Sequence, residues 1–106
     1  MNFIKGLQDV GLSKKEAGVY LACLKLGTAK ASDIAKQAEA PRTSVYNQIK
    51  ELINKGYIKK SKINGVEYYF PIEPVNILND AQEKIKSFSE ILPKLEKISD
   101  FSGERP

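Results

Sequence analysis

Several residue types that carry common chemistries are missing or rare in this sequence. It contains no histidine, and its 106 residues include a single cysteine, Cys23. Without histidine, the usual general base and the most common zinc ligand are both absent. One cysteine allows neither an intrachain disulfide nor a cysteine-rich metal site. Since no cluster of aspartate and glutamate suggests a carboxylate site either, we expect no metal, no cofactor and no catalytic residue.

Long apolar segments are missing as well. Residues 1–10 carry Lys5 and Asp9 and no apolar run, so they do not resemble a signal peptide. No apolar stretch approaches the roughly 20 residues that a membrane-spanning helix needs. We therefore expect a cytoplasmic protein without a membrane partner. A chain of 106 residues is sufficient for one domain with at most one appended element.

Positive charge is concentrated in one short window of the chain. The whole chain carries a net charge of +4, whereas residues 41–65 alone hold six Lys or Arg and one acidic residue, a net charge of +5. Residues 66–106 have a net charge of −3. A basic window of this kind is typical of a surface that binds a polyanion such as nucleic acid. A solvated, lysine-rich face has the same composition.

The first 30 residues carry the signals of a packed helix. Ser13 and Glu16 have the spacing of a capping box, and Gly27 supplies a helix stop. Between them, apolar residues recur at helical spacing, and Cys23 lies among them. Cys23 is therefore interpreted as part of the core, because a reactive thiol needs an exposed, electropositive setting. A short leading helix is expected around residues 3–7.

The next segment has the pattern of a helix-turn-helix. A short helix is expected to begin at an N-cap at Ser32 and to end near Ala38. After a tight turn, Pro41 is expected at the first position of a longer helix, about residues 42–55. That helix has a polar leading face and one apolar stripe, as a recognition helix requires. The stripe consists of Val45, Ile49, Leu52 and Ile53.

A basic hairpin is predicted to follow. The β-prone runs 57–63 and 66–72 flank Asn64-Gly65, and Asn-Gly is the strongest short signal for a type I′ hairpin turn, which needs positive φ at both positions. A lone two-stranded hairpin is marginally stable, so it must pack on the helices. The predicted fold is mainly α with a small β-hairpin, a winged helix-turn-helix over residues 1–73.

Residues 74–100 are predicted to form one long C-terminal helix, followed by a frayed tail over residues 101–106. Apolar residues recur at alternating spacings of three and four, the a/d pattern of a coiled coil. We expect this seam to form a homodimer; the alternative is that the helix folds back onto its own domain. Pro93 is expected to kink the helix or to end its first half. The predicted dimerisation residues are Leu78, Ala81, Ile85, Phe88, Leu92 and Leu95.

The start of the recognition helix holds the candidates for base contacts. A recognition helix reads the major groove with its N-terminal residues. Arginine can pair with guanine, asparagine with adenine, and a hydroxyl with either bases or phosphate. Tyr46 suits either a phosphate or packing against a neighbouring helix, and Lys50 suits a phosphate. The candidate base-reading residues are Arg42, Thr43, Ser44 and Asn47.

Two further groups of residues are expected to contact the DNA backbone. Lys30 and Ser32 lie at the start of the short helix, where free amides attract anions. Lys60 and Lys62 share one face of the first strand, and Asn64 lies at the hairpin tip, so that they can follow phosphates or enter the minor groove. Lysines in this position also protect an exposed strand edge from aggregation, and the two roles are compatible.

Several of these segments resemble the DNA-binding domain of TrmB-type transcription regulators, which are common in archaea and present in some bacteria. The resemblance covers about residues 7–75, and its most specific part is the Pro-Arg-x-x-Val-Tyr pattern of residues 41–46. The other matching segments are Gly11–Ala17, Val19–Ala22, Ala31–Ala35 and Leu52–Ile58. The resemblance implies a winged-helix dimer that binds operator DNA through Thr43, Ser44, Asn47 and their neighbours.

The resemblance does not extend to sugar sensing. Full-length regulators of this type carry a sugar-sensing domain after a coiled-coil linker, and the similarity here ends before such a domain. We therefore expect no small-molecule effector from these residues. A short stand-alone regulator and part of a longer one are both compatible with the sequence.

Two functions from different classes remain to be compared. The leading hypothesis is a homodimeric, sequence-specific transcription regulator that binds double-stranded DNA at a pseudo-palindromic operator with half-sites about one helical turn apart. The alternative is a winged-helix protein-interaction module of a transcription or chromatin assembly. Such a module would not need a basic recognition helix and a basic wing together. A nucleic-acid-modifying enzyme is disfavoured because the sequence has no histidine, carboxylate cluster or phosphate-binding glycine loop.

Overall fold

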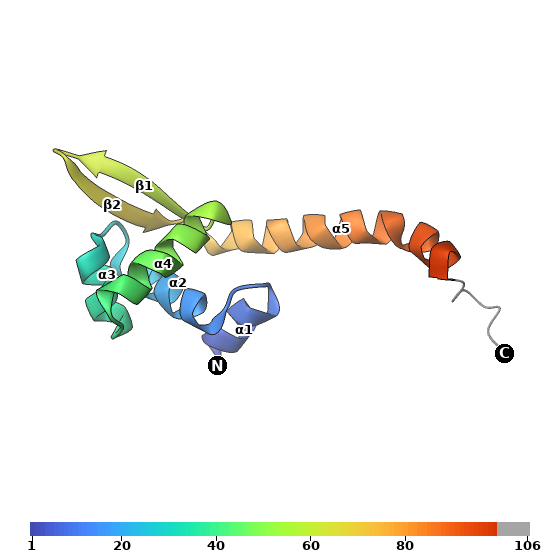
Figure 1. Cartoon of the computed structure of the whole chain (residues 1–106), viewed down its shortest axis with the longest axis horizontal. Helices are drawn as coiled ribbons and strands as arrows, with labels where there is room; N and C mark the ends of the chain where they lie inside the picture. Colours follow the sequence, from blue (N-terminus) through green and yellow to red (C-terminus); the bar gives the residue numbers. More distant parts are fainter. Residues whose placement is uncertain (100–106) are drawn as a thin grey trace. The chain divides into compact units, whose positions relative to one another are not determined.

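A computed structural model of the chain describes residues 1–99 and shows in them five α-helices and one antiparallel hairpin (Figure 1). The chain divides into two compact units, residues 1–73 and residues 74 onward. The predicted tail, residues 101–106, and the last residue of the predicted C-terminal helix lie outside the described residues. The elements are α1 (Phe3–Asp9), α2 (Lys14–Leu26), α3 (Ala31–Ala38), α4 (Arg42–Asn54), β1 (Ile58–Ile63), β2 (Val66–Pro71) and α5 (Pro74–Ser99).

Helix α2 begins and ends where local signals predict, whereas α1 extends two residues beyond the expected range of 3–7. The Asn2 side chain accepts a hydrogen bond from a backbone amide in the first turn of α1. At the start of α2, the Ser13 hydroxyl accepts from the Glu16 amide at 3.1 Å, and the Glu16 carboxylate accepts from the Ser13 amide at 2.7 Å. The predicted capping box is therefore confirmed. Gly27 ends α2 with a φ of 75°, which a residue with a Cβ adopts only at a cost.

Helix α3 begins two residues earlier than predicted. Lys30, not Ser32, is its N-cap residue, and Ser32 lies inside the first turn. The reason is a contact from a distant part of the chain. The Ala29 amide donates to the Tyr69 carbonyl at 2.9 Å, and the Tyr69 amide donates back at 2.8 Å. This bridge holds Ala29 extended against β2, so the helix begins directly after Lys30, whose carbonyl accepts the first helical hydrogen bond.

The turn between α3 and α4 also differs by one residue from the prediction. Pro41 is the N-cap of α4 rather than its first helical residue, because its ψ of 143° is extended. Glu39 ends α3 with a φ of 54°, in the left-handed region. The Pro41 carbonyl then accepts from the Val45 amide at 3.0 Å. The helix-turn-helix is present as expected, with the longer helix ending at Asn54 instead of Lys55.

The core of residues 1–73 is formed by one face of each of α2, α3 and α4 together with the inner face of the hairpin. Ile53, the last residue of the predicted stripe, is only half-buried. Full burial of one large apolar side chain, such as a leucine or an isoleucine, stabilises the fold by roughly 1.5–3 kcal/mol. Tyr20 also donates a hydrogen bond from its hydroxyl to the Ile72 carbonyl at 2.8 Å, which ties α2 to the chain after β2. The largest fully buried side chains are Tyr20, Ile34, Ile49, Leu52, Ile58, Val45 and Cys23.

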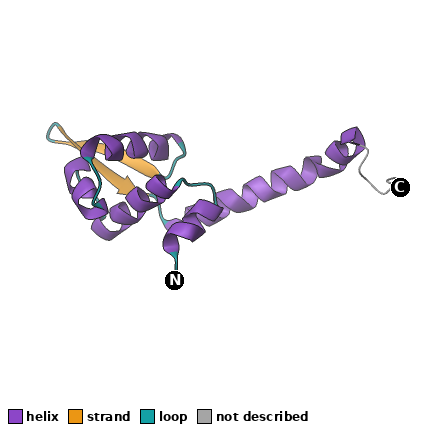
Figure 2. Cartoon of the chain, turned by 60° about the horizontal axis from the view of Figure 1, so that its bottom comes forward, coloured by secondary structure: helices purple, strands orange, loops and turns teal. Residues whose placement is uncertain are grey.

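The hairpin pairs from Ile58 with Pro71 to Ile63 with Val66, and its turn projects beyond the helices (Figure 2). Asn64 and Gly65 have φ angles of 50° and 78°. Positive φ at both turn residues confirms the predicted turn chemistry. The helices, the hairpin and the long helix after it together confirm the predicted fold class.

The second unit is helix α5, which runs without interruption from Pro74 to Ser99. The prediction that Pro93 ends the first half of this helix is therefore wrong, while a kink at Pro93 stays a prediction. A proline removes one amide donor, and the carbonyl left over belongs to an exposed turn, where water can donate to it. Asp80 and Lys84 form an ion pair at 3.0 Å, one turn apart. Within residues 1–99, no helix is both long and apolar enough to span a membrane.

Candidate nucleic-acid interface

Helix α4 separates an apolar side from a polar side, as a recognition helix must. Its apolar stripe is buried except for its half-buried last residue, whereas Thr43, Asn47 and Lys50 are exposed on the opposite side. Ser44 lies differently from these candidates. It is half-buried on the flank that faces α2, where it lines a groove together with Gly18. The exposed side therefore offers a hydroxyl, a carboxamide and an ammonium group within two helical turns.

Arg42 and Tyr46 occupy the other flank of α4. The Arg42 guanidinium donates to the Tyr46 hydroxyl at 3.3 Å, and it lies 5.9 Å from the centroid of the Tyr46 ring. Tyr46 is 44% exposed. A cation–π contact at an exposed site stabilises by about 0.5–1 kcal/mol, which is enough to favour one orientation of the Arg42 side chain. The two side chains therefore form a pre-positioned pair at the start of the helix.

A hollow of about 320 Å³ brings three elements of the first unit together. The start of α3, the Arg42 flank of α4 and the turn end of β2 all contribute to its lining. The start of α3 has no side-chain cap, so the amides of Ala31 and Ser32 remain available to a ligand. The lining residues are Lys30, Ala31, Ser32, Arg42, Tyr46, Gly65, Val66, Glu67 and Tyr69. The predicted contacts Lys30 and Ser32 therefore share one surface with Arg42 and Tyr46.

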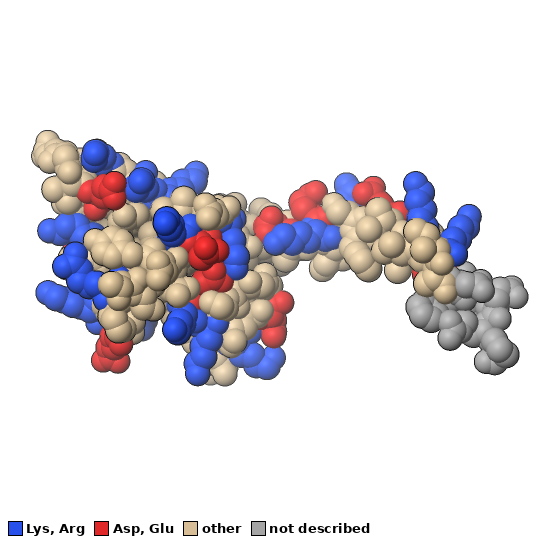
Figure 3. Space-filling view, in the orientation of Figure 1, with Lys and Arg blue, Asp and Glu red and all other residues tan. Residues whose placement is uncertain are grey.

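The hairpin presents two lysines on the face that carries its buried residues. Lys60 pairs directly with Tyr69, and Lys62 pairs with Glu67. Directly paired residues of antiparallel strands lie on the same face, and Tyr69 is buried, so this is the face toward the helices. Asn64 is exposed at the turn. Figure 3 shows many basic and fewer acidic side chains over the hairpin and the neighbouring helices, and both signs of charge along α5.

Glu67 is a charged member of this face that sequence reasoning did not select. Its carboxylate accepts a hydrogen bond from the Tyr69 hydroxyl at 2.9 Å and lies 3.7 Å from the Lys60 ammonium. The hydrogen bond from Tyr69 and the charge of Lys60 hold the pKa of Glu67 below its usual value. Burial and the Glu67 contact raise the pKa of Tyr69 to about 12. The Asn64-Gly65 turn could have revealed this position of Glu67, because a two-residue turn fixes the pairing of the two strands and so places Glu67 opposite Lys62.

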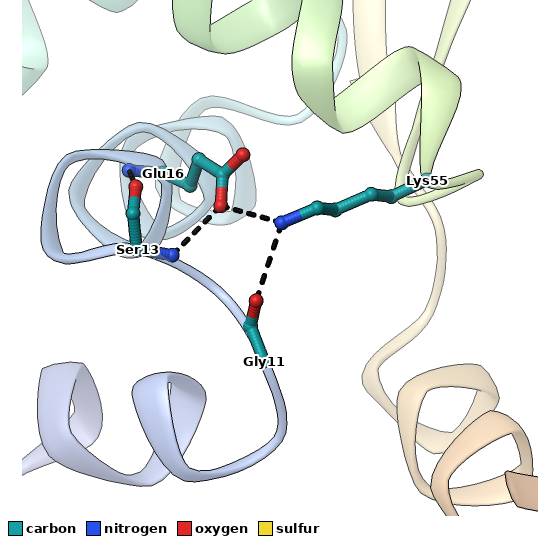
Figure 4. A network of polar contacts seen from close by, with 4 residues as sticks. All are labelled: Gly11, Ser13, Glu16 and Lys55. Atoms are coloured by element: carbon teal, nitrogen blue, oxygen red, sulfur yellow. Dashed lines mark hydrogen bonds and ion pairs between the residues drawn. The ribbon is translucent and has the colours of Figure 1, made fainter.

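A second polar network attaches the end of the recognition helix to the start of α2 (Figure 4). Lys55, which follows α4, donates to the Glu16 carboxylate at 2.8 Å and to the Gly11 carbonyl at 3.2 Å. The Glu16 side chain is 6% exposed and that of Lys55 is 37% exposed. Burial pushes the pKa of Glu16 upward, but hydrogen bonds from Lys55 and from the Ser13 amide outweigh it, so the pKa is lowered.

Lys55 therefore has a structural role, although it is one of the six basic residues in the basic window of residues 41–65. Its partner Glu16 is 39 residues away, and no local pattern links the two. Five of the six basic residues of that window remain for contacts with a polyanion. The network ties the end of α4 to the loop before α2 and to its first turn.

Cys23 takes no part in either network. It is buried in α2, and burial raises the pKa of its thiol to about 12. At neutral pH it is a neutral, apolar core side chain. Within residues 1–99, no group of three or more His, Cys, Asp or Glu side chains is arranged to hold a metal ion.

The predicted dimerisation seam lies on helix α5 of the second unit. Five of its six residues are large apolar side chains that are between 40% and 67% exposed, and Ala81 is half-buried. Ile91 and Ile98 widen the same apolar face. A contiguous apolar face of this length marks an interaction surface more often than it marks free solvent-facing surface. The five exposed members are Leu78, Ile85, Phe88, Leu92 and Leu95.

Comparisons with known proteins agree with this arrangement. Residues 7–75 match the model of a family described as the sugar-specific transcriptional regulator TrmB. The chain is 35% identical over 92 residues to the HTH-type sugar sensing transcriptional regulator TrmBL1 of Pyrococcus furiosus. That alignment covers 86% of this chain and 26% of the relative, so the chain spans about a quarter of that protein.

Two solved structures share the fold. A possible transcriptional regulator from Methanosarcina mazei Go1 superposes with a TM-score of 0.69 at 18% identity, over 89% of this chain and 82% of that one. TrmBL2, described as an archaeal chromatin protein with a novel mode of DNA binding, superposes with a TM-score of 0.66 at 20% identity. The second match covers 97% of this chain and 43% of TrmBL2. At these identities, the likeness concerns the fold.

Proposed function

The chain belongs to the TrmB family of winged-helix DNA-binding transcription regulators, and from this membership we propose that it recognises a specific operator as a homodimer. One observation carries the proposal. The Arg42 flank of α4, the start of α3 and the turn end of β2 line one hollow, and Lys60 and Lys62 pair directly with Tyr69 and Glu67, two of its β2 lining residues. A duplex can touch all three elements at once only if they belong to one surface.

Base reading is assigned to the start of α4. Asn47 is exposed in the middle of the polar side, where its carboxamide can pair with the adenine N6 and N7 atoms. Arg42 offers its remaining donors to guanine, and Thr43 offers a hydroxyl to either a base or a phosphate. Each good bidentate contact contributes about 1–3 kcal/mol of discrimination. Ser44, on the flank facing α2, is assigned to the edge of this contact.

Backbone contacts are assigned to the residues around the reading helix. Lys50 lies one turn after Tyr46 on the same flank of α4, so its ammonium group and the Tyr46 hydroxyl suit phosphates along one side of the groove. Lys30 and Ser32 present charge and the free amides of α3 to another phosphate. These contacts fix the position of the protein on the duplex, and the base contacts supply the sequence preference. The wing contributes Lys60, Lys62 and Asn64.

Dimerisation is assigned to the α5 seam. Two copies that pair their apolar faces would cover side chains such as Ile85 and Phe88, which are 67% and 55% exposed in the single chain. A two-fold dimer presents two recognition helices, so we expect a pseudo-palindromic site with half-sites about one helical turn apart. The heptad spacing supports a left-handed coiled coil.

Selection from a random DNA pool tests this function directly. The purified chain is used to enrich duplexes, and binding of the enriched and random duplexes is then measured by fluorescence anisotropy across a salt series. We expect a palindromic motif, tighter binding to it than to random DNA, and a steep loss of affinity with salt. A failure to enrich any motif, with weak binding to all duplexes, would reject operator recognition and favour a chromatin-type role.

A further inference from the structure

One acidic side chain lies inside the basic face of the wing. Of the described residues that line the hollow between α3, α4 and β2, Glu67 is the only acidic one. It lies directly opposite Lys62 in the hairpin register and near Lys60 on the same face. A carboxylate in this position works against the attraction of phosphates that the surrounding residues provide.

The contacts of Glu67 hold its charge in this place. One carboxylate oxygen accepts from the Tyr69 hydroxyl at 2.9 Å, and the other lies 3.7 Å from the Lys60 ammonium. Tyr69 is itself anchored, because it is buried and its backbone pairs with Ala29. Glu67 remains 45% exposed, so its charge is felt outside the protein. Its lowered pKa keeps it ionised throughout the neutral range.

We propose that Glu67 is a specificity-determining residue of the wing, which weakens binding to non-operator DNA more than binding to the operator. The inference rests on the proposed function. In the free protein, Glu67 neutralises Lys60, and against any duplex it repels the nearest phosphates. Non-specific binding is almost entirely electrostatic, so it carries this penalty without compensation.

Glu67 weakens binding to the operator less than binding to random DNA, and the reason is geometric. Base contacts from α4 hold an operator complex in one register, in which Lys60 can turn to one phosphate while Glu67 keeps its hydrogen bond to Tyr69. Non-specific complexes sample many registers and meet the carboxylate in all of them. The ion pair with Lys60 is exposed and long, so it adds little to folding stability, and its main effect falls on binding.

The first experiment compares E67Q with a matched control, E90Q. Both substitutions raise the net charge by one, but Glu90 is an exposed residue of α5 outside the predicted seam. Binding of the full chain to a random duplex and to a selected operator duplex is measured by fluorescence anisotropy over a salt series. For E67Q we expect the affinity for random DNA to rise about threefold to fivefold, and that for the operator less than twofold. The salt slope of E67Q on random DNA should steepen by up to about one. E90Q should change neither the affinity for random DNA nor this slope.

A double-mutant comparison tests whether Lys60 mediates the effect. If Glu67 acts through Lys60, the gain from E67Q should fall by more than half when Lys60 is already replaced by methionine. Thermal melting by circular dichroism checks that each variant is folded. Equal gains for E67Q and E90Q, or equal gains on random and operator DNA, would overturn the proposal. A wild-type chain that binds no DNA would instead overturn the proposed function itself.

Discussion

Replacing Lys55 with methionine tests the network that holds the recognition helix in place. Methionine keeps an unbranched apolar side chain of similar length but removes the ammonium group. Glu16 then loses the 2.8 Å contact from Lys55, although its carboxylate keeps the bond from the Ser13 amide. Because the Glu16 side chain is only 6% exposed, little water can replace the lost partner.

The expected loss of stability lies between two known limits. Removing one partner of a fully buried ion pair costs about 3–5 kcal/mol, and removing an exposed pair costs under about 1 kcal/mol. The Lys55 side chain is 37% exposed, so solvent screening discounts the buried value. We therefore expect Lys55→Met to lower the free energy of unfolding at pH 7 by about 2 kcal/mol.

The same variant has a defined pH dependence. The pKa of Glu16 is lowered in the folded protein, so its ion pair contributes stability above the pKa of the unfolded chain. That contribution is lost as the pH falls through the folded-state pKa and Glu16 takes up a proton. The difference in stability between the wild type and Lys55→Met should therefore narrow on acidification from pH 7 to about pH 3.5.

Urea denaturation followed by circular dichroism at both pH values measures these differences. Lys59→Met is the matched control, because Lys59 is an exposed lysine on the opposite face of β1 from Lys60 and should change stability by less than about 0.5 kcal/mol. A loss for Lys55→Met no larger than that of Lys59→Met would refute the structural role of the pair. A difference that stays constant between the two pH values would show that the ionised form of Glu16 is not what matters.

The remaining predictions concern DNA binding and assembly. Asn47→Ala should weaken operator binding by about 1–3 kcal/mol and leave binding to random DNA nearly unchanged, because it removes a base contact; competition between the two duplexes measures this. Lys60→Ala should weaken binding to random and operator duplexes both and reduce the salt slope by about one, because it removes a phosphate contact. The same pattern of losses for both variants would contradict these roles. Charged substitutions at Ile85 and Phe88 together should give a monomer in sedimentation experiments, because they place like charges in the seam; a persistent dimer would assign assembly to another surface.

Local features of the fold follow from residues that are close in sequence. The Ser13–Glu16 capping box and the positive φ angles of Asn64 and Gly65 were predicted correctly. Each depends on at most four consecutive residues, whose side chains and backbone geometry suffice to decide it. The buried stripe of α4 has the same origin, because helical periodicity places its members on one side.

The features that were missed depend on contacts between distant segments. The start of α3 was misplaced because Ala29 pairs with Tyr69, forty residues later in the chain. Glu16 and Lys55 were assigned separate local roles, since nothing near either residue indicates the other. For Pro93, helix propensity predicted either a kink or an end, and the helix does not end there, because water can satisfy the one carbonyl left over.

The candidate interface divides in the same way. Its residue types, its charge and the order of its elements are present in the linear chain, because capping, turns and periodicity act over a few residues. Which of those residues share a surface is a tertiary property. Packing of the hairpin against the helices brings Arg42, Lys30 and Glu67 around one hollow and takes Lys55 away from it. Such proximity arises only when the core closes, because it depends on burial summed over the whole domain and on no single segment.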